Sequence, residues 1–586
     1  MTILIESAVL KNAHSCAFLF IILALSGPVL VDASDDFTQE DWAPASSWEA
    51  ADPALDKSLL SEIEQVLGND YRRATDERLT KLVEGLLPVF QALPKNEYGK
   101  LGHSSVRYLL HRFFVEKHGW FVEGLFTEGA AWNASSPTHA LQNHVPMLVQ
   151  GFFEKRLGGR GFGLHEMAVL VSIIENSIND EAMEKLKQTY QILGLQLNKT
   201  LSTQEATHVQ EVYLTSLILH LNMTDLTNKS LLKYRNNIEF YYPTWPHASK
   251  WLQRIREDLT HGDKNATFTP AEIGAMVRQI VESWGLFHGS QCAGLKEHLL
   301  SMEERASTGC VPLVDFYDSG VKGRSTWLFI ETPEYLQHIG VLDQSDATNP
   351  RVLMANYINS PTNCLQPSPY YLVCCHNECD DILGQLERKI AAPTATPQEI
   401  LAAIALPHVA PGKKLPNAAL RKRLEEVAAR HEGQVPLHGR LFAQWMHHAY
   451  PHECPYPHLS GTKNPEYTEE YEIETGRSSQ LTDDEMLEII RNASALAPKR
   501  ANQTSGMEAA SCAPWEQEEE LFVALPPPIH RLSLAELEED PHVWRFAAVI
   551  AVFGASITML LQITRSCKKL AHINLAELPI KGLQVV

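Results

Sequence analysis

Apolar residues recur at helical spacing along most of the first half of the chain. In residues 101–125 they repeat at intervals of three and four, which predicts a helix with one buried face. Ser202 with Glu205 and Thr269 with Glu272 have capping-box spacing ahead of further apolar runs. No alternation typical of strands is clear before residue 310, so we predict an α-helical array for this half.

The pattern becomes mixed after residue 310. Residues 325–331 and 351–358 read as short strands. Further helices are predicted at residues 378–389, 397–406, 418–430, 437–449 and 482–495, and Thr396 with Glu399 has capping-box spacing ahead of the second of these. From about residue 465 the chain is acidic and interrupted by Pro, Ser and Thr, a composition that predicts a solvated stalk.

The N-terminus has the form of a secretory signal peptide. Lys11 precedes a run of ten apolar residues at 16–25, and small residues follow up to Ala33. This run is too short to span a bilayer comfortably, because a spanning helix needs about 20 residues. We therefore expect cleavage after Ala33.

A second apolar segment near the C-terminus is long enough to cross a membrane. Residues 546–564 carry no charge over 19 positions, which as a helix rising about 1.5 Å per residue approaches the ~30 Å hydrocarbon core. Acidic residues precede this segment, and Arg565, Lys568 and Lys569 follow it. The positive-inside rule then places the C-terminus in the cytosol.

These patterns predict a mainly α fold, with a helical lumenal array followed by a cysteine-bearing, mostly helical domain, a stalk and one transmembrane helix. The predicted parts are a signal peptide (1–33), a cysteine-free helical lumenal domain (34–291), a cysteine-bearing mostly α domain (292–464), an acidic stalk (465–543), a transmembrane helix (544–564) and a basic cytosolic tail (565–586).

Composition excludes several classes of protein. The 586 residues are 44% hydrophobic and 21% charged, as in ordinary globular proteins, which argues against disorder and against a multi-pass membrane protein. The formal net charge of −21 argues against a nucleic-acid partner, because phosphate contacts need clustered Lys and Arg.

The cysteines indicate an oxidising compartment. Of the ten cysteines, Cys16 lies in the predicted signal peptide and Cys567 lies past the predicted span. Cys567 is a candidate for palmitoylation, and an unmodified thiol is the alternative. An even number remains on the lumenal side, which predicts up to four disulfides, although eight cysteines allow 105 pairings. The eight are Cys292, Cys310, Cys364, Cys374, Cys375, Cys379, Cys454 and Cys512.

Three of these cysteines form the run Cys374-Cys375-His376-Asn377-Glu378-Cys379. No Cys-x-x-Cys pair typical of zinc ribbons is present, so disulfides to separate partners are the favoured interpretation. Adjacent cysteines bond to each other only with strain. We expect Cys375 and Cys379 to lie on one helix face and to fasten it to two neighbours.

Seven Asn-x-Ser/Thr sequons, all between the signal peptide and the span, predict N-glycosylation in the same compartment. They begin at Asn133, Asn198, Asn222, Asn228, Asn265, Asn492 and Asn502.

The densest group of histidines occupies residues 438–458. His447, His448, His452 and His458 offer imidazole ligands to a transition metal such as zinc, with Glu453 as a general base. His448 and His452 have the four-residue spacing of one helical face, but Pro451 makes a continuous helix doubtful. A disulfide at Cys454 would remove that thiolate as a ligand. A helix end packed by aromatic side chains and held by a disulfide is the competing interpretation.

Residues 101–125, residues 439–458 and the Cys374 to Cys379 run resemble a family of uncharacterised secreted or single-pass membrane proteins from protist algae. The resemblance covers much of the predicted lumenal part. It includes no catalytic motif, so it implies no activity and no functional residue.

Two functions fit these observations. The first is a single-pass type I membrane glycoprotein without a cofactor, whose helical, disulfide-bonded ectodomain binds a protein or glycan partner. It would reside in the secretory pathway or at the cell surface, with a lumenal or extracellular N-terminus. The alternative is a membrane-anchored lumenal metalloenzyme that uses zinc at the 438–458 histidines.

Overall fold

The structure is a computed structural model that describes residues 71–125, 161–501 and 512–523, apart from internal gaps at 123, 261–262, 264–265, 304–306, 326, 407–408 and 410–414. The predicted signal peptide, membrane span and cytosolic tail lie outside these residues. Within the described chain, no helix combines the length and the hydropathy that a membrane crossing requires.

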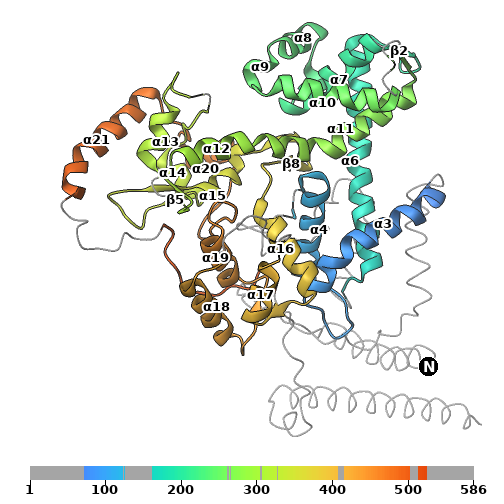
Figure 1. The fold of residues 1–586 in the computed structure, drawn as a ribbon. Helices are drawn as coiled ribbons and strands as arrows, with labels where there is room; N and C mark the ends of the chain where they lie inside the picture. The colour runs from blue at the N-terminus through green and yellow to red at the C-terminus, as the bar shows by residue number, and fades with distance from the viewer. Residues whose placement is uncertain are drawn as a thin grey trace, which may run out of the picture. The chain divides into compact units, whose positions relative to one another are not determined.

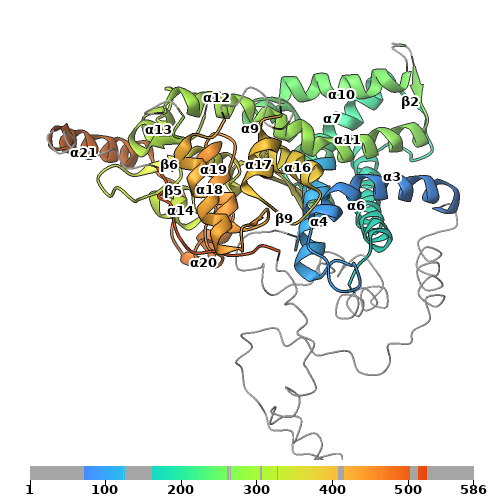
Figure 2. The same ribbon diagram turned by 60° about the horizontal axis from the view of Figure 1, so that its bottom comes forward.

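The described chain is mainly helical, as predicted (Figure 1). The helices of the first half are α3 (Tyr71–Ala92), α4 (His103–His118), α6 (Leu164–Leu193), α7 (Thr203–Ile218), η3 (Met223–Asp225), α8 (Asn228–Asn236), α9 (Ile238–Tyr241), α10 (Trp245–Thr260) and α11 (Pro270–Gln291). α3 packs on α6, and α10 lies beside α11 (Figure 2).

The predicted capping boxes are present at the starts of their helices. The hydroxyl of Ser202 accepts a hydrogen bond from the Glu205 amide at the start of α7, and Thr269 does the same with Glu272 at the start of α11. A third capping box, at Thr396, begins α17. Each box pairs backbone donors that the first turn of a helix would leave unpaired.

Helix α4 is buried on more than the one face that the sequence predicted. It ends at His118, and twelve of its residues are buried, including Arg107 and Arg112. α11 passes directly against its end, since a Cβ added at Gly285 would lie 2.4 Å from the carbonyl oxygen of His118. α3 and α6 also pack on it, so α4 is a central helix rather than an amphipathic surface helix.

Five helices of the second half begin within three residues of their predicted starts: α16 (Glu378–Ile390), α17 (Pro397–Ile404), α18 (Ala418–Arg430), α19 (Arg440–Ala449) and α21 (Asp483–Ala501). The sequence did not predict the other helices of this half, which are α12 (Ala293–Ser301), α13 (Leu313–Gly320), α14 (Pro333–His338), α15 (Met354–Ile358), η4 (Pro361–Asn363) and α20 (Thr468–Thr475).

The described residues form four small antiparallel sheets, several of which connect segments far apart in sequence. In the first sheet, β8 (Tyr371–Val373) lies between β1 (Trp120–Val122) and β7 (Leu365–Ser368), and in the second, β6 (Arg351–Leu353) lies between β4 (Cys310–Pro312) and β5 (Leu342–Asp343). The other two sheets have two strands each. They pair β2 (Leu201–Ser202) with β3 (Thr267–Phe268), and β9 (Thr394–Ala395) with β10 (Val435–Pro436).

The sheets correct two expectations. Strands do occur before residue 310, but β1, β2 and β3 are too short for alternation to reveal them. Because Phe121 of β1 pairs with Leu372 of β8, one sheet joins the predicted domains 34–291 and 292–464. The boundary at residue 291 therefore does not coincide with a division of the described fold.

The two strands predicted in the second half are largely wrong. Only Arg351–Leu353 of residues 351–358 is a strand, and the chain turns into α15 at Met354. In residues 325–331 a single bridge joins Glu331 to Gln480. Apolar runs of this length fit a strand or a buried helical turn equally well, and tertiary packing decides between them.

The predicted solvated stalk is wrong for the parts of 465–543 that the structure describes. Tyr471 of α20 and Met486 of α21 lie in the hydrophobic core with Phe316 and Tyr357. Residues 512–523 return to α19, where the Arg440 amide donates to the Glu520 carbonyl over 2.7 Å. A few buried apolar side chains anchor a segment whose composition is otherwise acidic.

Candidate functional site

All eight cysteines of the predicted lumenal part form disulfides, which confirms the prediction of four bonds. The pairs are Cys292–Cys375, Cys310–Cys512, Cys364–Cys374 and Cys379–Cys454. The adjacent Cys374 and Cys375 have separate partners, as expected.

One detail of that prediction is wrong, because Cys375 and Cys379 do not share a helix face. The side chain of Asn377 accepts a hydrogen bond from the Cys379 amide over 3.1 Å and caps α16, so the helix begins at Glu378. Cys375 lies ahead of the helix and is bonded to Cys292 at the end of α11.

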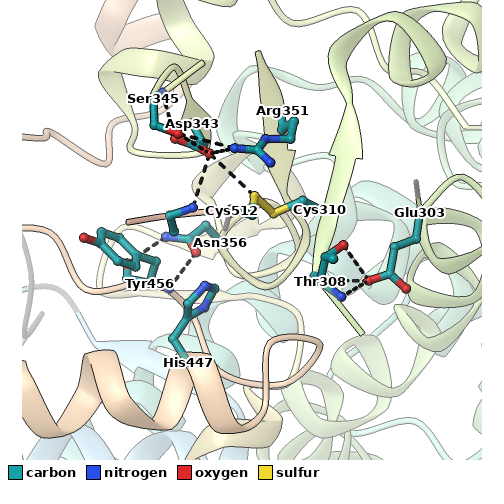
Figure 3. The surroundings of a disulfide bond; sticks show 12 residues. Glu303, Thr308, Cys310, Asp343, Ser345, Arg351, Asn356, His447, Tyr456 and Cys512 are labelled. Carbon is teal, nitrogen blue, oxygen red and sulfur yellow. Dashed lines mark hydrogen bonds and ion pairs between the residues drawn. A yellow bond between two sulfur atoms is a disulfide. The ribbon is translucent and has the colours of Figure 1, made fainter. Parts of the chain in front are cut away.

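The Cys310–Cys512 disulfide lies in a buried polar joint (Figure 3). An Asp343 carboxylate oxygen accepts hydrogen bonds from Arg351 Nη2 over 2.9 Å and from the Ala513 amide over 3.2 Å. Asp343 is only 8% exposed, so these donors replace the water that its charge has lost. These contacts fix the segment around residue 512 to the β4–β6–β5 sheet.

A second pair of contacts closes the same joint. Asn356 Oδ1 accepts from the Tyr456 amide over 2.7 Å, and its Nδ2 donates to the Tyr456 carbonyl over 2.9 Å. The Tyr456 hydroxyl donates to the Pro514 carbonyl over 2.9 Å. Three separate stretches of chain are thereby held around one disulfide.

The four histidines proposed as metal ligands bond to different partners. His447 Nδ1 is 2.8 Å from the Cys454 carbonyl oxygen, His452 Nε2 is 2.9 Å from Glu303 Oε1, and His458 Nε2 is 2.7 Å from the Gly340 carbonyl oxygen. The His448 ring lies beside the Trp515 ring, with centroids 5.8 Å apart and the ring planes tilted by 32°.

The surroundings of His447, His448 and His458 favour neutral imidazoles. Burial lowers the pKa of His447 and of His448 to about 4, and it also lowers that of His458. α19 ends at Ala449, so His448 and His452 do not share a helical face. Cys454 is in a disulfide, and Glu453 accepts a hydrogen bond from Lys296 Nζ over 3.2 Å. Among the described residues, none of these side chains belongs to a group of three converging ligand atoms.

The sequence did not reveal a buried ionic network between α4 and α16. Glu387 is fully buried, with Oε1 accepting from the Tyr108 hydroxyl over 3.0 Å and lying 2.9 Å from His438 Nε2. Arg112 Nη2 is 3.5 Å from Glu387 Oε2, and Arg112 Nη1 is 2.6 Å from Asp380 Oδ1. The only signal in the sequence is the four-residue spacing of Tyr108 and Arg112 on one helix.

The network keeps Glu387 charged. Burial alone would raise its pKa, but the Arg112 charge and the hydrogen bonds from His438 and Tyr108 outweigh burial and hold the pKa below its ordinary value. Each charge has a partner, as the interior requires. A hollow lined by His438, Pro94 and Leu521 holds about 10 Å³, room for roughly one water molecule.

A similar hollow of about 10 Å³ lies where α6 and α7 meet β7. Glu181, Lys185 and Tyr213 line it, and Ser368 donates to Glu181 Oε2 over 2.6 Å. It too holds about one water molecule, so neither hollow accepts an organic substrate without rearrangement.

Comparison of the chain with protein-family models, with curated proteins and with solved structures finds no match in any of the three. The resemblance to the protist-algal family therefore stays a prediction.

Of the sequons, Asn198, Asn222, Asn228 and Asn492 fall in described parts of the chain, and all four are exposed. Asn133, Asn265 and Asn502 lie outside them, as does Cys567.

Proposed function

We propose that the chain is a type I membrane glycoprotein whose helical, disulfide-bonded body binds a protein or glycan partner on the lumenal or extracellular side. The observation that carries this proposal is the pairing of all eight cysteines between residues 292 and 512. Disulfides persist in the secretory pathway and outside the cell, whereas the cytosol keeps thiols reduced.

Partner binding is favoured over catalysis by what the two hollows can hold. Each has space for about one water molecule, whereas a small-molecule site usually encloses about 300 Å³ or more. A macromolecular partner needs only a surface. The α9 segment offers one, because Phe240 is 84% exposed and Tyr241 is 51% exposed, with ring centroids 5.3 Å apart. Exposed aromatic side chains are enriched where proteins bind partners.

The compartment and topology can be tested on the full-length chain expressed in a eukaryotic secretory system with a C-terminal tag. Thiol labelling under denaturing, non-reducing conditions should leave the eight cysteines unlabelled, and glycosidase treatment should lower the apparent mass. Protease added outside sealed vesicles should remove only the tag. Eight reactive lumenal thiols, or a mass unaffected by glycosidase together with a protected tag, would overturn the proposal.

The binding role has its own test. The purified ectodomain, with Phe240→Ser and Tyr241→Ser as the variant, would be applied to intact cells and to a glycan array. Saturable binding that the double variant loses supports the proposal. Leu328→Ser is the matched control, since Leu328 is also 70% exposed but lies elsewhere. Binding that the control and the double variant lose equally would contradict a specific role of α9.

A further inference from the structure

Three side chains capable of binding a metal converge beside α14, at a place that the sequence did not single out. His338 ends α14, Glu466 lies just ahead of α20, and Glu474 lies in the last turn of α20. One ligand atom from each lies within 4.8 Å of the other two. In the described chain this is the one such group of three.

Two of the three ligand atoms form an ion pair with each other but make no hydrogen bond of acceptable geometry. His338 Nε2 and Glu466 Oε2 are both shielded from solvent, and neither has a hydrogen-bond partner of acceptable geometry. Buried nitrogen and oxygen atoms are nearly always paired, so this arrangement needs an explanation. The other oxygen of Glu466 is already engaged, because it accepts a hydrogen bond from Asn464.

The separation of these two atoms fits a bridging cation better than a direct hydrogen bond. His338 Nε2 and Glu466 Oε2 are 3.4 Å apart, beyond the roughly 2.9 Å typical of an N–H···O bond. Tetrahedral zinc with ligands at about 2.0–2.1 Å places neighbouring ligand atoms about 3.4 Å from each other. The distance between these two atoms therefore matches one edge of such a tetrahedron, and the Glu474 carboxylate lies within 4.8 Å of both.

The charges of the two carboxylates also favour a bound cation. A carboxylate oxygen of Glu466 and one of Glu474 lie within 4.8 Å of each other, and two negative charges at such a separation repel. A divalent cation between them would remove this repulsion. The His338 ring is held in position by the buried Tyr471, whose ring centroid lies 5.1 Å from that of His338.

We propose that His338, Glu466 and Glu474 bind a divalent cation of the zinc type, with the fourth position open to water or to a ligand from outside the chain. Imidazole and carboxylate ligands suit zinc, and three protein ligands with an open position form a common zinc geometry. Glu474 is exposed, so its carboxylate is free to approach the ion. The ion would join α20 to α14. This site is separate from the 438–458 histidines and does not depend on the proposed function.

The test is zinc binding by the full-length chain after dialysis against a chelator, followed by titration with zinc chloride in a calorimeter. His338→Gln and Glu474→Gln remove one ligand each. His376→Gln is the matched control, because His376 is a half-exposed imidazole that also lies near carboxylates, with Nε2 2.7 Å from Asp381 Oδ2. We expect one zinc site that weakens at least tenfold in both ligand variants and is unchanged in the control.

Cobalt supplies a second readout. Cobalt bound at a tetrahedral site absorbs in the visible range, and this absorbance should appear with the wild-type chain and be lost with Glu474→Gln, whose exposed position makes misfolding an unconvincing cause. The proposal is wrong if the wild-type chain binds no zinc, or if Glu474→Gln binds zinc as the wild-type chain does. Loss of the site only on His448→Gln would assign the zinc to the histidine cluster instead and would equally overturn it.

Discussion

The buried carboxyl group of Glu331 should make the protein less stable as the pH rises. Glu331 is 7% exposed and lies among aromatic side chains, where Tyr357 donates to Oε1 over 3.0 Å and Oε2 has no hydrogen-bond partner. Burial raises the pKa of Glu331 from its ordinary 4.5 to about 7. The folded state therefore favours the protonated acid, and ionising it requires a charge to lie in the core.

The size of the effect follows from the two pKa values. A pKa raised in the folded state gives stability that is fully present below pH 4.5 and is lost as the pH rises through 7. At 1.36 kcal/mol per pKa unit the loss is about 3 kcal/mol in total, of which about 2 kcal/mol falls between pH 5 and pH 7.

Glu331→Gln isolates this contribution, because glutamine keeps an oxygen for Tyr357 but cannot ionise. The free energy of unfolding would be measured by urea titration at pH 5, 6 and 7, and the wild-type value subtracted from that of the variant. This difference should increase by about 2 kcal/mol from pH 5 to pH 7. His447 and His448, with pKa values of about 4, give the opposite slope below pH 6.5, but they are present in both proteins and cancel.

Glu425→Gln, which removes an exposed carboxylate from α18, serves as the control and should show no such trend. A difference between Glu331→Gln and wild type that stays constant across this pH range would refute the assignment of a raised pKa to Glu331.

Two further predictions concern the interior. Loop-closure entropy predicts that replacing Cys310 and Cys512 with alanine costs about 5 kcal/mol and replacing Cys364 and Cys374 about 3 kcal/mol, because the bonds close loops with separations of 202 and 10 residues. Urea titration of both double variants tests this order, and equal losses would contradict it. Arg112→Met should destabilise the protein by about 3–5 kcal/mol by leaving Glu387 buried without its cation, whereas the exposed Arg324→Met should change stability by less than about 0.5 kcal/mol. Similar losses in thermal unfolding for the two variants would show that the network is not a structural one.

Local signals in the sequence predicted what depends on neighbouring residues. The capping boxes at Ser202, Thr269 and Thr396 lie at helix starts in the structure, because a cap involves residues three positions apart. The even number of cysteines predicted four disulfides, but not which of the 105 pairings forms, since the choice depends on the folded chain.

Features that depend on distant segments were not predictable from the sequence. The acidic composition after residue 465 concealed Tyr471 and Met486, which fill a core built mainly from residues 295–358. His338 and Glu466 are more than a hundred residues apart, and the eight-residue spacing of Glu466 and Glu474 has no recognisable pattern. Only the folded chain brings them together.

The bond between Cys310 and Cys512 also affects how the protein is made. Synthesis proceeds at roughly 5–20 residues per second, so Cys310 waits on the order of 10–40 s before its partner, 202 positions later, has been translated. During that time Cys364, Cys374 and Cys375 emerge as competing thiols. Any bond that these thiols form prematurely would have to be undone by thiol–disulfide exchange. Folding of this chain should therefore depend on a disulfide isomerase, although all eight cysteines of the described residues are paired in the finished fold.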